Sequence, residues 1–227
     1  MFNGFTPAAR DFLWELAFNN ERVWFNEHKE QFEQTVNEPF KALAAETQAL
    51  MCSRFPEMDC RLHVSRIYRD ARRLFGRGPY KDHLWFSIKH GSILLEGPMF
   101  WFEIGAADYS YGMGFYSATP SQMEAFRRSL DANPARFERI VRKIERGGEF
   151  VLTGEEYKRP KGHADDPLGR WYNRKRIGLE CSRDYDAALY SPELPGILTD
   201  AYAKLMPMYE YFLEFYHSAD GEKGEKP

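Results

Sequence analysis

The residues of this chain that are best suited to chemistry lie between positions 61 and 90. This stretch holds eight Lys or Arg and two Asp, so it carries +6 in a chain of 227 residues whose net charge is −3. An arginine fork matches the oxygens of a carboxylate or phosphate with two hydrogen bonds at a time. The sequence therefore predicts an anion-binding site with ligand contacts from Arg66, Arg69, Arg72, Arg77 and Lys81.

A second basic segment covers residues 158–176. It holds seven Lys or Arg and two Asp, which gives +5, so the other 178 residues sum to −14. If the two segments meet in space, they form one cationic pocket in an acidic body, and such a pocket focuses field lines on a compact anion. In that arrangement Lys161, Arg174 and Lys175 would close the site from the second segment.

Two side chains in the first segment are candidate catalytic groups. Tyr80 and His83 could each donate a proton to a bound anion, because both follow the arginines closely. The alternative for Tyr80 is a packing role, and the alternative for His83 is a hydrogen-bonded structural role. His163 in the second segment has the same two interpretations as His83. Asp70 and Asp82 each follow a cation and are interpreted as orienting it.

Three functional interpretations are open at this point. In the first, the protein binds a small phosphate- or carboxylate-bearing ligand, with or without catalysing a reaction on it. In the second, the basic face docks an acidic protein or a nucleic-acid backbone, and binding weakens steeply with salt. In the third, the arginines pair with acids of the chain itself, where exposed ion pairs contribute only about 0–1 kcal/mol.

The sequence argues against several other classes of protein. It contains no dinucleotide fingerprint, phosphate-loop lysine motif, zinc-protease motif or paired Cys-x-x-Cys, so no cofactor and no metal are predicted. No apolar run approaches the roughly 20 residues that a membrane-spanning helix needs. The three cysteines show no metal spacing, and together with the lack of a signal-peptide pattern they favour a cytoplasmic protein with free thiols.

The elements that must position these residues indicate an α+β fold. Thr6-Pro7, Thr119-Pro120 and Asn133-Pro134 are typical helix starts, with a capping residue before a first-turn proline. Alternating residues predict strands, mostly antiparallel, at 62–68, 84–88, 99–104 and 109–116, and shorter ones at 150–152 and 177–181. A long helix is predicted from about Leu194. We expect a single domain over residues 1–220, with helices at both ends, and a disordered polar tail over 221–227.

Several motifs resemble, in order, those of the family called domain of unknown function 2461. They are Asn19-Asn20, Trp24-Phe25, Arg66-Ile67-Tyr68-Arg69-Asp70, Pro79-Tyr80-Lys81, Gly112-Met113-Gly114, Pro120 and Arg159-Pro160-Lys161-Gly162. The resemblance runs from about Phe5 to Phe215. It implies an α+β protein, and it supplies no reaction, cofactor or catalytic residue.

Overall fold

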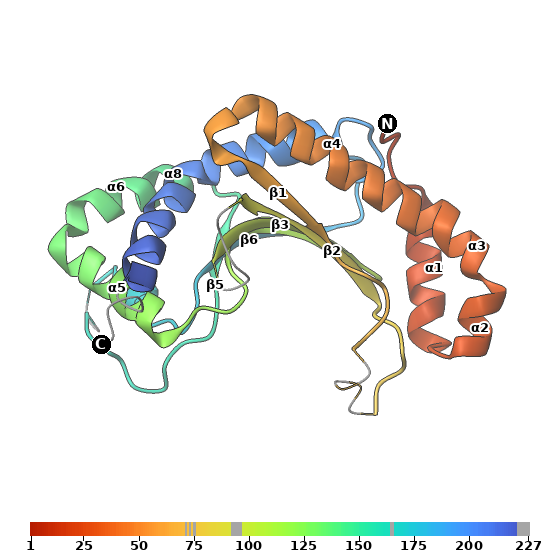
Figure 1. The fold of residues 1–227 in the computed structure, drawn as a ribbon, viewed down its shortest axis with the longest axis horizontal. Helices are drawn as coiled ribbons and strands as arrows, with labels where there is room; N and C mark the ends of the chain where they lie inside the picture. The colour runs from red at the N-terminus through yellow and green to blue at the C-terminus, as the bar shows by residue number, and fades with distance from the viewer. Residues whose placement is uncertain (71, 73, 75, 92–96, 164–165, 222–227) are drawn as a thin grey trace. The chain divides into compact units, whose positions relative to one another are not determined.

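A computed structural model describes residues 1–70, 72, 74, 76–91, 97–163 and 166–221 (Figure 1). Among these residues it has helices towards both ends of the chain and a six-stranded antiparallel sheet in the order β1-β2-β3-β4-β6-β5. The predicted α+β class is therefore confirmed. The described part of the chain has no helix with the length and apolar character required to cross a membrane.

The chain forms two compact units. The first consists of Met1–Gly91, Trp101–Tyr111 and Ser182–Asp200, and the second consists of Ser92–Phe100, Gly112–Cys181 and Ala201–Pro227. Three strands and the last helix pass from one unit to the other along the chain: β3 (Pro98–Gly105), β4 (Asp108–Phe115), β6 (Gly178–Asp184) and α8 (Leu194–Gly221). The expectation of a single domain stays a prediction.

The first unit begins with four helices and a π-helical turn. Their bounds are α1 (Pro7–Phe18), α2 (Arg22–Glu27), α3 (Lys29–Phe32), the π-helical turn (Glu33–Asn37) and α4 (Glu38–Arg54). Pro7 and Pro39 lie in first turns, where the missing N–H removes no helical hydrogen bond. Thr6 makes no side-chain capping bond, so the proline alone marks the start of α1.

Strands β1 (Cys60–Val64) and β2 (His83–His90) pair antiparallel, with Cys60 opposite His90 and Val64 opposite Phe86. A short 3-10 turn, Pro56–Met58, connects α4 to β1. Strand β1 ends four residues before the predicted boundary, and Tyr68 joins Tyr80 only through an isolated bridge. Helix α4 packs on β1 and β2 (Figure 1), where Phe40 contacts the ring of Phe86.

The second unit is built around the contact between three helices. It contains α5 (Pro120–Ala132), α6 (Pro134–Glu145), β5 (Val151–Thr153), α7 (Gly169–Tyr172) and the C-terminal part of α8. Thr119 forms a capping box with Gln122, and Asn133 accepts from the Arg136 N–H, as the sequence predicts. Phe126 of α5 packs edge-on against Phe137 of α6.

The boundary between the last helix and the predicted C-terminal tail differs slightly from expectation. Helix α8 continues through Pro207 to Gly221, the first residue of the predicted tail. Residues 222–227, the rest of that tail, lie outside the described residues. The connection between β3 and β4 is the two residues Ala106-Ala107, one residue shorter than the expected Ala106-Ala107-Asp108.

Candidate functional site

The basic segment of the first unit folds back on itself after β1. The Arg69 N–H donates to the Pro79 carbonyl at 2.8 Å, and the Lys81 N–H donates to the Ile67 carbonyl at 2.8 Å. These bonds flank the bridge between Tyr68 and Tyr80. Two backbone bonds and one bridge therefore fix Arg69 and Tyr80 on the two neighbouring arms of a short ribbon, although the described residues between them form no regular strand.

The linker between α1 and α2 clamps this ribbon through Asn20. The Asn20 amide donates to the Tyr80 carbonyl at 3.0 Å, and the Tyr80 N–H donates to Asn20 Oδ1 at 2.9 Å. The close approach requires a residue without Cβ at position 78, since a Cβ on Gly78 would lie 2.2 Å from Asn20 Oδ1. The sequence analysis singled out Asn20 only as part of the Asn19-Asn20 motif, so its role as a clamp was missed.

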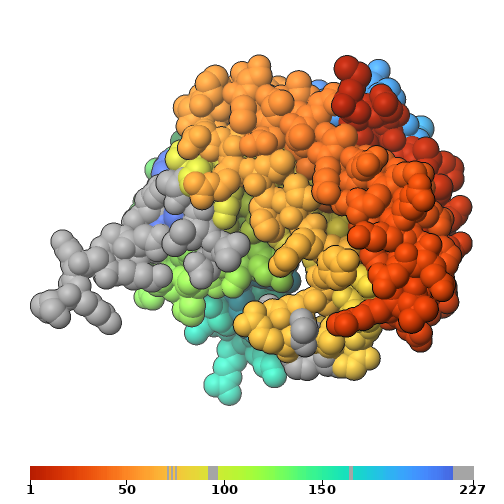
Figure 2. All heavy atoms as spheres, turned by 45° about the vertical axis from the view of Figure 1, so that its right-hand side comes forward, coloured from red at the N-terminus to blue at the C-terminus, as the bar shows by residue number. Residues whose placement is uncertain are grey.

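A pocket of about 290 Å³ lies between α2 and the ribbon. Figure 2 shows the surface hollowed where the orange-red N-terminal helices meet the yellow-orange ribbon. The lining residues are Arg22, Asn26, Tyr68, Arg69, Leu74, Pro79 and Tyr80. All of them belong to the first unit, so the pocket is complete within it.

The pocket presents two guanidinium groups. Arg69 is held in place because its Nε donates to the Tyr80 carbonyl at 2.7 Å, and its Nη2 lies 3.6 Å from Asp82. Its side chain is only 16% exposed. Arg22, by contrast, is exposed, and no acid in the described residues forms an ion pair with it. Because a guanidinium carries five N–H donors, both arginines retain donors for a ligand.

Tyr80 forms a wall of the pocket. Its ring is buried and stacks on Phe25 at 4.0 Å between centroids. Burial, assisted by the neighbouring Tyr68 and opposed by the charge of Arg22, raises the pKa of Tyr80 above 10. The phenol therefore stays protonated at neutral pH, where it suits hydrogen-bond donation to an anion better than proton transfer.

His83 is placed differently from Tyr80. It is the first residue of β2 and is not among the residues that line the pocket. Its Nδ1 lies 3.0 Å from Asp82 Oδ1. Burial disfavours the charged form of Asp82, but this effect is outweighed by hydrogen bonds from His83 and from the backbone and by the positive charges of His83 and Arg69. The pKa of Asp82 is therefore lowered from its ordinary value of 3.8. Asp82 thus orients Arg69 and His83, whereas the sequence led us to expect that it orients Lys81, the cation directly before it.

The remaining predicted cations of this segment have other environments. Lys81 extends its ammonium to the Arg66 carbonyl, and burial together with the charges of Arg69 and Arg66, opposed by Glu103, lowers the pKa of Lys81. Arg66 itself is exposed. Exposed Arg72 pairs with Asp70 at 2.8 Å, and Arg77 is exposed in the turn. Of the five predicted ligand contacts, only Arg69 lines the pocket.

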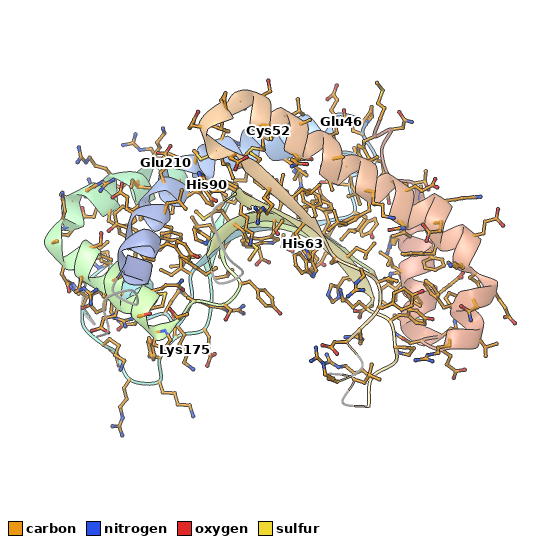
Figure 3. The ribbon with its side chains drawn as sticks, in the orientation of Figure 1. Glu46, Cys52, His63, His90, Lys175 and Glu210 are labelled. Atoms are coloured by element: carbon orange, nitrogen blue, oxygen red, sulfur yellow. The ribbon has the colours of Figure 1, made fainter. Side chains whose placement is uncertain are left out.

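The second basic segment belongs to the second unit. Arg174 is 13% exposed, pairs with Glu156 at 3.0 Å, and donates to the Gly154 and Arg170 carbonyls. Lys175, labelled in Figure 3, pairs with Glu155. These two cations match the internal-pairing interpretation. Lys161 instead places its ammonium 5.0 Å from the centroid of the Tyr157 ring. A joint pocket of both segments stays a prediction.

Among the described residues, the acidic and sulfur side chains do not assemble a metal site. Within the part of the chain that the structure describes, no group of three His, Cys, Asp or Glu residues has an arrangement that could hold an ion. Asp165, one of the adjacent acids 165–166, lies outside the described residues.

A family model described as a conserved hypothetical protein, DUF2461, matches residues 8–211. The chain belongs to this family. The match spans Asn20, Arg22, Arg69 and Tyr80, so the pocket lies wholly inside the family region. A comparison with curated proteins found no match.

Proposed function

We propose that this DUF2461 protein binds a small anionic ligand, bearing a carboxylate or phosphate group, in the pocket between α2 and the ribbon. The observation that supports this most directly is that Arg22 and Arg69 both line one concave site. A volume of about 290 Å³ suits a compact metabolite and not a polymer. The half-exposed ring of Tyr68 adds an apolar wall beside the two cations.

The two arginines would contribute to ligand recognition in different ways. Arg69 is fixed by the Tyr80 carbonyl and by Asp82, so it can present its free N–H groups without losing much side-chain entropy. Arg22 lies on α2 and is exposed, so it can adjust to the ligand. Tyr80 supplies a neutral donor, and no reaction is assigned to the site.

The alternative of a docking face for nucleic acid or an acidic protein requires a broad basic surface. Arg72 pairs with Asp70, and Lys81 is directed to a backbone carbonyl, so the segment presents fewer free cations than its sequence suggests. Concavity and internal pairing favour the small ligand. Salt distinguishes the two, because a complex with several phosphates weakens steeply as salt rises and a pocket ligand does so less.

The test is calorimetric titration of the purified chain with inorganic phosphate and with citrate at constant ionic strength. Arg22→Ala is the main variant because the described structure gives Arg22 no ion pair that would be lost. A hydrogen bond to a charged group contributes about 1.5–3 kcal/mol, so we expect the dissociation constant to rise roughly 10- to 150-fold.

Arg72→Ala is the matched control, since it removes an arginine of the same ribbon that does not line the pocket. Its affinity should equal that of the wild type. Equal affinity for Arg22→Ala and Arg69→Ala as well, with all three variants folded, would refute the proposed site.

A further inference from the structure

Arg127 of α5 lies in an unusual environment in the second unit. Its guanidinium carbon lies 5.6 Å from the centroid of the Tyr157 ring and 5.9 Å from that of the Tyr172 ring. Cation–π attraction to the two rings holds the guanidinium while leaving its in-plane N–H groups without acceptors. The faces of the two tyrosine rings therefore position the Arg127 guanidinium, but they cannot accept strong hydrogen bonds from its N–H groups.

One of those N–H groups is buried and unsatisfied. Arg127 Nη1 is covered, and no acceptor in the described structure takes a hydrogen bond from it. Asp131, four residues later on the same helix, would ordinarily be its partner. Both Asp131 oxygens are already engaged, however, by His163 Nε2 at 2.9 Å and by the Tyr172 hydroxyl at 3.0 Å. Since a buried unpaired donor costs free energy, the arrangement favours an acceptor from outside the protein.

The loop that faces Arg127 is held in a defined conformation. The Lys161 N–H donates to Asn173 Oδ1 at 2.6 Å, and the Asn173 amide donates to the Gly162 and Gly169 carbonyls at 2.9 Å each. His163 occupies the left-handed region with φ of 53°, which is uncommon for a residue other than glycine. Asn173 thus fixes Lys161 and His163 beside α5 and α7.

The charges around Arg127 leave a positive excess. The hydrogen bond to Asp131, opposed by burial and supported by a second bond to Asp166, raises the pKa of His163 above 6.5. Arg127 and Lys161 balance Asp131 and Asp166 in charge, so the positive excess comes from the other cations of the loop and from His163 where it is protonated. Lys161 interacts with the Tyr157 ring and with no acid of the described residues. Exposed Lys158 and Arg159 add two cations to the same loop, and Figure 3 shows long nitrogen-tipped side chains standing out from it.

We propose that Arg127, with Lys161, forms a second anion site that binds the phosphate group of a small molecule. A phosphate offers several acceptor oxygens and a charge near −2, which suits an unsatisfied guanidinium N–H beside an ammonium. Nη1 is covered while the side chain as a whole is half-buried, so binding requires a local movement of the flanking side chains. This site lies in the second unit and does not depend on the pocket of the first.

The test is phosphate titration in the Arg69→Ala chain, in which the pocket of the first unit should bind phosphate at least about tenfold more weakly. Adding Arg127→Lys keeps the charge but removes the fork, and the dissociation constant should rise at least about tenfold. Arg128→Lys is the matched control, because Arg128 is the next residue of α5 and pairs with Glu124. It should leave phosphate affinity unchanged.

A crystal of the same chain soaked in selenate gives a second measurement that does not depend on affinity. An anomalous peak within hydrogen-bond reach of Arg127, roughly 2.7–3.2 Å from a guanidinium nitrogen, would support the site. Three results would overturn it: no phosphate binding in the Arg69→Ala chain, equal binding with Arg127→Lys, or selenate absent while an ordered water takes the Nη1 hydrogen bond. Binding of a single-stranded oligonucleotide without any binding of phosphate would overturn the small-molecule assignment.

Discussion

Asn20 gives the sharpest prediction about how the pocket is held together. Replacing it with alanine removes the acceptor of the Tyr80 N–H and one of two donors to the Tyr80 carbonyl. Arg69 Nε still donates to that carbonyl at 2.7 Å, so the carbonyl stays satisfied. The Tyr80 N–H, in a residue that is only 3% exposed, is left without its partner.

The expected magnitude follows from that single unsatisfied donor. A buried donor that loses its acceptor costs about 1–3 kcal/mol, so the free energy of unfolding should fall by about 2 kcal/mol. For a chain of this size each kcal/mol corresponds to a melting-temperature shift of roughly 2–4 °C. Asn20→Asp keeps the acceptor for the Tyr80 N–H, so we expect a smaller loss.

The assay is urea unfolding of Asn20→Ala beside Asn19→Ala, the neighbouring asparagine. Asn19 donates only to the exposed Glu15 carbonyl within its own helix end, so its replacement should change stability by less than about 0.5 kcal/mol. Hydrogen exchange at the Tyr80 amide should accelerate in Asn20→Ala alone. If both variants unfold alike and Tyr80 exchanges at the wild-type rate, the clamp does not stabilise the ribbon.

Two further predictions concern titration and thiol reactivity. Burial, together with the charges of Lys89 and Lys81, lowers the pKa of His63, whereas the pKa of His163 is raised. An NMR titration should therefore place the midpoints of the two histidines on opposite sides of pH 6.5. Stability contributed by His163 should be full below pH 6.5 and decline as pH rises through its folded-state pKa; a His163→Gln chain that keeps this decline would contradict it. The pKa of Cys60 is raised to about 12, mainly by burial. The hydrogen bond and charge of Cys52 and the charge of Asp59 raise it further. Iodoacetamide at pH 8 should therefore modify Cys52 well before Cys60, as peptide mass mapping would show, and equal rates would refute the assignment.

The features that could be read from the sequence are those fixed by neighbouring residues. The cap and proline pairs before α5 and α6 act within one helical turn, so their pattern predicted both helix starts. The pairing of the strands predicted at 99–104 and 109–116 could be expected because a short connection favours an antiparallel hairpin. The basic character of both loop segments was equally plain from the residue types.

Which cations could bind a ligand was decided only by tertiary contacts. Asn20 contacts Tyr80, which lies 60 positions later in the sequence. Arg127 contacts the rings of Tyr157 and Tyr172, which are also distant from it in the sequence. No local pattern marks such pairs, because they depend on where separate elements come to rest. The same is true of Arg174, which the sequence analysis named as a ligand contact but which is paired with Glu156. Charge density was therefore a property of the sequence, whereas the availability of each charge was set by the fold.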